Sequence, residues 1–231
     1  MNKSFFSLYN SNARPAREQN LFVGLSKHLY CLADGTLKHQ KKPIDPRIPG
    51  SKRLITRFVL LDTDTGTVYG EIHAPETSKD LAGFLARAWS KKAAHPMKGI
   101  PSILNIPQSV HKDSDYAEDM RKIQSWAGIS VGELPSGFAA GVHAVKQFER
   151  SVGSLLWRAS DMEPADIFIA KACSAVLSVE ASGTSAFLWK ERWDQVAEPD
   201  DAFFAAIDKL YTSEGAWRLA PFDFVLNGLP R

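Results

Sequence analysis

Residues 53–74, RLITRFVLLDTDTGTVYGEIHA, decide the fold class of this 231-residue chain. Two runs rich in β-branched and aromatic residues flank Thr65-Gly66, a dipeptide suited to a tight turn, so the stretch predicts an antiparallel hairpin over residues 54–74. Asp62 and Asp64 border this turn, and we interpret them as side chains that cap backbone N–H groups there. A sheet is therefore the starting point of the fold.

A helix and a further strand follow the hairpin. Residues 75–92, PETSKDLAGFLARAWSKK, have apolar side chains at helical spacing, with Thr77 or Ser78 as candidate N-cap and lysines in the last turn. The apolar run SILNI at 102–106 predicts a buried strand, parallel to the first because a helix intervenes. The first strand is predicted within residues 29–40, LYCLADGTLKHQ. This order predicts an α/β fold with three antiparallel strands, then parallel strands, in one mixed sheet.

Four more helices are predicted downstream. Residues 115–128 form an amphipathic pattern closed by Gly128, and a long helix is predicted from near Gly141, with Glu149 beside its apolar stripe. Further helices are predicted at 164–179 and 201–211. The connection at 129–138 has room for one short strand.

These elements divide the chain into three parts. Residues 1–27 show no sustained periodicity and are interpreted as an extended N-terminal arm. Residues 28–160 form the core, and residues 161–231 form a C-terminal helical extension that completes it.

The composition is that of an ordinary globular protein, with 44% hydrophobic residues and a formal net charge of +2. No run approaches the ~18 to 20 apolar residues that span a bilayer, and the polar start lacks the apolar stretch of a signal peptide. We therefore expect a cytoplasmic protein with no membrane partner. Cys31 and Cys173 are too few for a disulfide framework or a cysteine zinc site, and both are interpreted as structural.

Charge is unevenly distributed along the chain. Residues 1–60 hold eleven Lys and Arg against three Asp and Glu, a net charge of +8, so the remaining residues carry −6. The densest basic stretch, residues 38–53, suits double-stranded DNA because neutralising phosphates releases counterions. Its cations are the predicted phosphate contacts: Lys38, Lys41, Lys42, Arg47, Lys52 and Arg53. Charge alone is equally consistent with a solvated, flexible loop.

Several motifs occur along this chain in the same order as the motifs of a known catalytic core. They are LADGTL at 32–37, FVLLDTDTGTVYGEIH at 58–73, GIPSILNIPQSV at 99–110, KQFERSVGSLL at 146–156 and the stretch 202–224. Together they resemble the integrase-type (DDE) transposase catalytic core, the ribonuclease H-like fold shared by retroviral integrases and phage Mu-type transposases. The resemblance implies a ribonuclease H-like mixed sheet flanked by helices.

The resemblance also implies a site. Asp34 stands for the first catalytic carboxylate and Glu149 for the third, while Asn105 occupies the position of the second. The family needs three acids because two Mg²⁺ ions must be held while water or a DNA 3′-hydroxyl attacks a phosphodiester. Asn105 supplies a neutral carbonyl, and the Asn-Gly that usually follows is replaced by Ile106-Pro107. Asp34 and Glu149 alone are expected to bind Mg²⁺ weakly at most.

The same residues have simpler interpretations. Asp34 before Gly35 suits an Asx-type turn, and Glu149 suits an ion pair at the helix rim. Four further acids are candidates to hold a cation in place of the missing one, although a solvated helix N-terminus explains them more simply. They are Asp113, Asp115, Glu118 and Asp119. The six histidines show no metal-ligand spacing.

Three functions are compatible with the sequence. The first is a catalytically impaired, integrase-like protein of DNA integration, transposition or recombination that binds DNA and acts as an assembly or regulatory subunit, with a partner transposase or by self-association. The alternative is an active Mg²⁺-dependent DNA strand transferase or nuclease using Asp34 and Glu149. The third is an unrelated α/β domain. We favour the first because the acid set is incomplete, and whether the chain is an enzyme stays open.

Overall fold

The computed structural model describes residues 16–33, 37–64, 66–73, 80–91, 95, 97–134, 137–158 and 201–209. Some predictions fall outside these residues: Asp34, Cys173, the candidate caps Thr77 and Ser78, the helix at 164–179 and residues 1–15 of the predicted arm.

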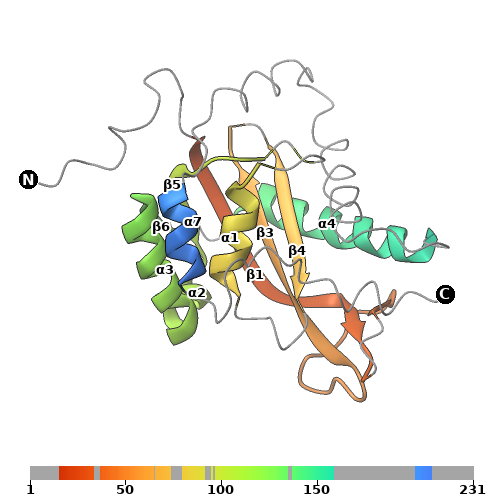
Figure 1. The fold of residues 1–231 in the computed structure, drawn as a ribbon. Helices are drawn as coiled ribbons and strands as arrows, with labels where there is room; N and C mark the ends of the chain where they lie inside the picture. The colour runs from red at the N-terminus through yellow and green to blue at the C-terminus, as the bar shows by residue number, and fades with distance from the viewer. Residues whose placement is uncertain are drawn as a thin grey trace, which may run out of the picture.

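A six-stranded mixed sheet forms the centre of the described structure (Figure 1). Its strands lie in the order β4 (Val68–His73), β3 (Arg53–Asp62), β1 (Ala16–Cys31), β5 (Pro101–Ile106) and β6 (Ser130–Glu133), and β2 (Leu37–His39) pairs with β1. Strands β2 and β3 run antiparallel to β1, and β4 runs antiparallel to β3. Strand β5 runs parallel to β1, and β6 runs parallel to β5. The predicted hairpin, the parallel strand and the mixed α/β sheet are confirmed.

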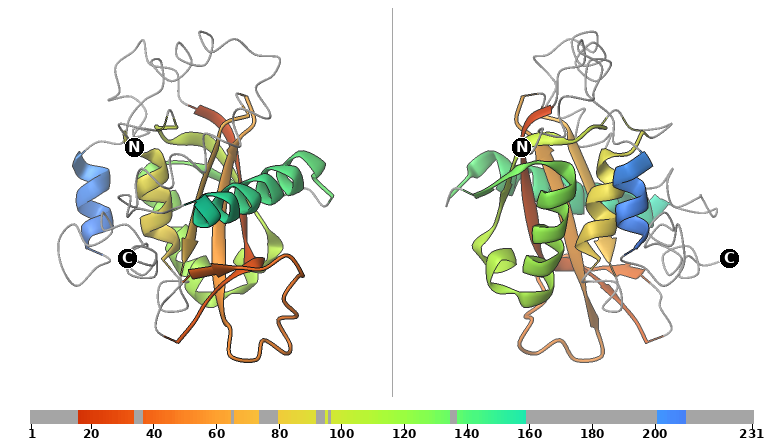
Figure 2. Two further views of the ribbon diagram at one scale, coloured as in Figure 1. Left: turned by 90° about the vertical axis from the view of Figure 1, so that its right-hand side faces the viewer. Right: turned by 60° about the vertical axis from the view of Figure 1, so that its left-hand side comes forward.

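Helices cover both faces of the sheet (Figure 2). Helices α1 (Leu81–Trp89), α3 (Ser114–Ala127) and α7 (Asp201–Asp208) lie on one face, and α4 (Ala139–Arg158) crosses the strands on the other. The short helix α2 (Gln108–Lys112) joins β5 to α3. Within the described residues, none of the helices is both long enough and apolar enough to cross a membrane.

Local signals explain where the helices begin and end. Helix α1 starts at Asp80, whose side chain accepts a hydrogen bond from the Gly83 N–H at 3.2 Å. Helix α3 starts at Asp113, which accepts hydrogen bonds from two N–H groups of the first turn. It ends at Gly128, which has a φ of 65°, a conformation that glycine adopts without strain. The predicted end of this helix is confirmed.

The first strand differs most from expectation. We predicted an arm through residue 27 and one strand within 29–40, but β1 runs from Ala16 to Cys31 through the middle of the sheet. Residues 37–39 return as β2, with Leu37 opposite Cys31. The polar residues 18–20 do not have the apolar pattern by which a buried strand is predicted. They are stable in the sheet because their side chains have hydrogen-bond partners on elements distant in the sequence. Gln19, for example, is buried and accepts a hydrogen bond from Trp89 Nε1 at 3.0 Å.

A charged network is buried between β4 and α1. Glu71 is fully buried and accepts two hydrogen bonds from Arg87 at 2.8 Å, one from Tyr69 at 2.7 Å and one from His73 at 2.8 Å. Burial opposes ionisation of Glu71, but Arg87 and His73 outweigh it and lower the pKa of Glu71 to about 2. Asp80 also accepts from Arg87, at 3.1 Å. The network links α1 to the sheet by buried ion pairs, in which removing one charge would leave its partner uncompensated.

Candidate nucleic-acid interface

A small polar cluster lies on the α4 side of the sheet, where β1, β5 and β6 meet. Asn105 of β5 lies in register with Asn20 of β1, and its Nδ2 donates to Glu18 Oε1 at 2.7 Å and to Asn20 Oδ1 at 3.0 Å. Its carbonyl lies over Gly132 of β6, where an added Cβ would come within 2.3 Å of Oδ1. We call Glu18, Asn20 and Asn105 the amide cluster. Two of its acceptors, Glu18 Oε1 and Asn20 Oδ1, are occupied by the N–H groups of the Asn105 amide.

Glu149 reaches the same face of the sheet but at a different level along β1. Its side chain is nearly buried, and Oε1 accepts a hydrogen bond from Arg57 Nη1 at 3.0 Å. The same Arg57 nitrogen donates to the Leu25 carbonyl. Asn20 and Leu25 are five residues apart in β1, roughly 16 Å in an extended strand. Glu149 and Asn105 therefore belong to separate sites, and the ion-pair interpretation of Glu149 describes its contacts.

The resemblance implies that Asp34 lies on the first strand, beside the strand that carries Asn105, whereas the strand neighbour of Asn105 is Asn20. Asp34 follows Cys31, the last residue of β1, and lies outside the described residues. The reason is that β1 begins at Ala16, twelve residues before the predicted start of the core at residue 28. The earlier, polar part of the strand therefore lies beside β5.

The residues of this face do not suit a pair of Mg²⁺ ions. The amide cluster has one carboxylate, Glu18, and Mg²⁺ pairs are held by several carboxylate oxygens. Glu149 is already neutralised by Arg57. Across the described parts of the chain, no group of three or more His, Cys, Asp or Glu lies together as a metal site would require. Joint binding of Mg²⁺ by Asp34 and Glu149 stays a prediction.

The other acids have structural roles. Asp62 ends β3 and is buried, and its backbone carbonyl, not its carboxylate, accepts from the Gly66 N–H at 2.9 Å in the predicted turn. Asp113 caps α3, and Glu118 pairs with Lys122 at 2.7 Å. Burial raises the pKa of Asp119 to about 6, with Asp80 and Glu118 adding to the effect. The contacts of Asp113 and Glu118 agree with the interpretation of a solvated acidic helix start, whereas Asp119 is partly buried.

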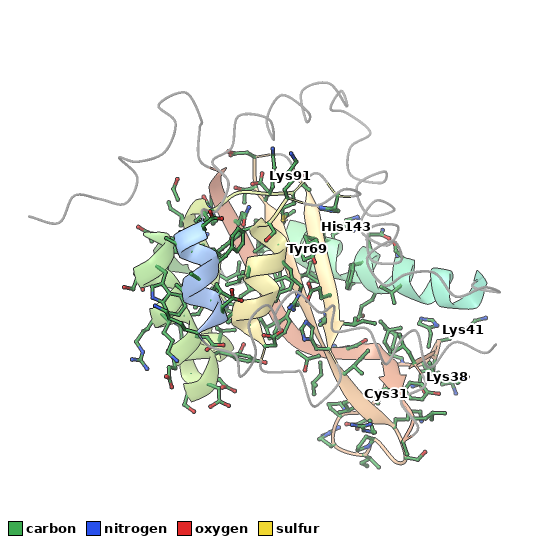
Figure 3. The ribbon with its side chains drawn as sticks, viewed as in Figure 1. Cys31, Lys38, Lys41, Tyr69, Lys91 and His143 are labelled. Atoms are coloured by element: carbon green, nitrogen blue, oxygen red, sulfur yellow. The ribbon has the colours of Figure 1, made fainter. Side chains whose placement is uncertain are left out.

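The basic segment, residues 38–53, forms β2 and the loop that leads to β3. Lys38, Lys41 and Lys42 are exposed there. Figure 3 shows Lys38 and Lys41 close together at one end of the sheet. This end meets the C-terminal half of α4, because an added Cβ at Gly153 would lie 2.7 Å from the His39 ring. The three lysines are therefore available to a phosphate backbone beside α4.

The remaining predicted contacts have local partners. Arg47 pairs with Asp45 at 3.0 Å, and both side chains are exposed. The Lys52 ammonium lies 5.4 Å from the centroid of the Tyr30 ring. Arg53 begins β3 and is half-buried, and its backbone carbonyl accepts from the Cys31 thiol at 3.7 Å. These three cations are less available for phosphate than Lys38, Lys41 and Lys42.

A cavity of about 630 Å³ lies between α4 and the sheet, next to the basic segment. Five cationic side chains line it: Lys27, Lys41, Arg57, Lys146 and Arg150. Glu149 is the one acid in the lining, so the cavity carries a net charge of +4 when its histidines are neutral. The cavity therefore attracts anions.

The rest of the cavity lining is apolar or aromatic. It consists of Phe22, Val23, Pro107, Val142 and Val145 together with the imidazoles of His28 and His39. The two imidazole centroids lie 6.1 Å apart in a stacked arrangement. Burial and the neighbouring His28 lower the pKa of His39, although Glu149 opposes them. At neutral pH the His39 ring is therefore mainly an uncharged flat surface.

Sequence reasoning missed most of the cavity cations. Lys146 and Arg150 are four residues apart on α4 and therefore lie on the same side of the helix, next to Glu149. This spacing is visible in the sequence. Arg57 is a single charge inside the apolar run of β3, which is also a visible signal. The position of Lys27 in the cavity lining was not predictable in this way, because residues up to 27 were interpreted as an extended arm.

No family model matches this chain, and no curated protein shows significant sequence similarity to it. What the interface does must follow from its own geometry.

Proposed function

We propose that this chain is an integrase-like module with a ribonuclease H-like fold, which binds double-stranded DNA and acts as a non-catalytic assembly or regulatory subunit in DNA integration or transposition. The sheet order β4-β3-β1-β5-β6 supports this proposal. It combines three antiparallel strands with two parallel ones, the arrangement that the sequence resemblance implies. Helix α4 also lies where the third family acid is expected, next to the central strands.

The pairing of Asn20 with Asn105 carries the non-catalytic part of the proposal. In the family that the motifs resemble, the first strand and its parallel neighbour carry the first two metal-binding acids. Here the adjacent positions of β1 and β5 both hold amides. With Asn20 in place of Asp34 at the first position, two anions are missing, which weakens metal binding more than the single Asn105 replacement that the sequence indicated. The active-enzyme alternative gains no support from Glu149, since Arg57 occupies its carboxylate.

The exposed lysines in and just after β2 support the DNA-binding part. Lys38, Lys41 and Lys42 lie next to a cavity of net positive charge, so one face of the molecule combines both features. Contacts of this kind recognise the phosphate backbone and carry little sequence preference. A partner transposase would then supply catalysis, and self-association of the chain would serve assembly.

Fluorescence anisotropy with a labelled duplex tests DNA binding. Because each phosphate contact contributes about −0.9 to the slope of log affinity against log salt, the double variant Lys38→Ala/Lys42→Ala is expected to reduce the slope by about 1.8. Arg121→Ala on α3 is the matched control, since Arg121 is exposed on the opposite side of the sheet from α4. A flat salt titration of the wild type, or an equal loss in Arg121→Ala, would contradict DNA binding through β2.

A second experiment tests the absence of catalysis. Asn105→Asp puts a carboxylate against Glu18 in place of a 2.7 Å hydrogen bond, so we expect a lower melting temperature that Mg²⁺ partly restores. The wild type is expected to show no Mg²⁺-dependent stabilisation and no joining of preprocessed DNA ends. Efficient joining by the wild type in Mg²⁺, abolished by Glu149→Gln, would overturn the non-catalytic assignment.

A further inference from the structure

The cavity between α4 and the sheet has the charge and fixed donors of an anion site. Arg57 lies at its inner wall, where Glu149 and the Leu25 carbonyl hold the guanidinium in one orientation. A guanidinium fixed in this way is suited to phosphate, because its planar N–H groups match phosphate oxygens. Lys27, Lys41, Lys146 and Arg150 are exposed cavity residues, and within the described structure none of the four is in an ion pair.

The cavity also offers flat surfaces, which a bare phosphate site would not need. The Phe22 ring lines the cavity and stacks on Phe138 with a centroid separation of 6.2 Å and an interplanar angle of 5°. The stacked imidazoles of His28 and His39 form a second flat surface. Nucleic-acid bases stack on aromatic side chains of this kind without regard to sequence. Charge and ring surface together match a phosphorylated nucleotide.

The position of the cavity connects it to the proposed DNA-binding surface. Lys41 belongs both to the exposed lysines near β2 and to the cavity lining. A volume of about 630 Å³ is in the range of small-molecule sites and has room for about one nucleotide, not for a duplex. A duplex held by the basic segment would therefore bring only the end of one strand to the cavity.

We propose that the cavity binds the phosphorylated terminal nucleotide of a DNA strand. This inference rests on the proposed function, since the duplex must first contact the basic segment. The phosphate lies against Arg57 and the surrounding lysines, and the base lies against Phe22 or the imidazole pair. The module thereby distinguishes DNA ends from continuous duplex, which is the distinction that an assembly subunit at a DNA end requires.

Binding of matched oligonucleotides tests the inference. The labelled duplexes have a frayed end carrying a 5′-phosphate, a 3′-phosphate or hydroxyl groups only. One charge-assisted phosphate contact corresponds to about tenfold in affinity, so one phosphorylated end is expected to bind about tenfold more tightly than the hydroxyl end. Equal affinity of all three duplexes for the wild type, with the salt dependence intact, would overturn the inference and leave the proposed function standing.

A space-filling variant separates the cavity from general charge. Val142 lines the cavity and is 49% exposed, so Val142→Trp fills the space without changing charge or the core. We expect it to abolish the preference for a phosphorylated end while leaving the hydroxyl duplex and its salt slope unchanged. Ser125→Trp on α3 is the matched control and should retain the preference. Lys146→Gln should lower the preference by a charge change alone, and an unchanged preference in both cavity variants would contradict the site.

Free ligands distinguish this inference from failure of DNA binding itself. If no duplex binds, the proposed function fails, and thermal shift with deoxynucleoside monophosphate then tests the cavity alone. Stabilisation of the wild type but not of Val142→Trp would support a nucleotide site. An equal shift with inorganic phosphate, or no shift with either ligand, would overturn it.

Discussion

The buried pair of Glu71 and Arg87 should make a large and pH-dependent contribution to stability. Glu71→Gln keeps the side-chain size but removes the charge, and it leaves the buried Arg87 guanidinium with Asp80 at 3.1 Å. The fall in the pKa of Glu71 from 4.5 to about 2 corresponds to about 3 kcal/mol, since one pKa unit is about 1.4 kcal/mol. Breaking a buried ion pair by removing one partner costs about 3 to 5 kcal/mol, which agrees.

The sign of the pH effect follows from the lowered pKa. This stabilisation is present above the unfolded pKa of about 4.5 and is lost as the pH falls toward 2, so about 2 kcal/mol of it should be gone at pH 3. Urea unfolding at pH 7 and pH 3 should therefore show a difference between wild type and Glu71→Gln that shrinks on acidification. Glu118→Gln, at an exposed pair, should change little at either pH. A loss below about 1 kcal/mol at pH 7, or a difference independent of pH, would refute the reasoning.

Three further predictions concern α4, β3 and α3. Gly141→Ala should lower the free energy of unfolding by about 1 to 3 kcal/mol in urea titration, because the new Cβ would lie 1.9 Å from the Phe22 ring. Arg57→Gln leaves the Glu149 carboxylate nearly buried without its cation, so we expect a loss of about 2 kcal/mol together with loss of the DNA-end preference in anisotropy. Asp119→Asn should stabilise the protein at pH 7 but not at pH 4, because a pKa raised to about 6 makes the ionised carboxylate unfavourable above that pH. A melting-temperature profile that is parallel for both proteins would contradict the last prediction.

Elements with strong local patterns were predictable from the sequence. The hairpin of β3 and β4, helices α1 and α3 and the parallel strand β5 all lie where residue periodicity and turn residues placed them. These patterns work because a helix or strand with one apolar face, bounded by caps and turns, is determined by neighbouring residues. The basic segment was equally evident, and the exposure of Lys38, Lys41 and Lys42 agrees with its composition.

Residues of the candidate site were predicted in part. Asn105 and Glu149 were singled out, and both reach the α4 side of the sheet. Their partners were not predictable, because the hydrogen bond from Asn105 to Asn20 joins residues 85 positions apart and that from Arg57 to Glu149 joins residues 92 apart. Only strand register and helix placement bring such residues together.

The order of the local elements and the concentration of positive charge near β2 can therefore be predicted from the residues alone. Three features depend on the folded chain: Glu18 and Asn20 lie in a central strand, amides meet where β1 joins β5, and α4 encloses a cationic cavity. They depend on it because a polar side chain in the middle of a sheet is stable only with a hydrogen-bond partner. For Glu18 and Asn20 that partner comes from another strand, whose position local periodicity does not encode.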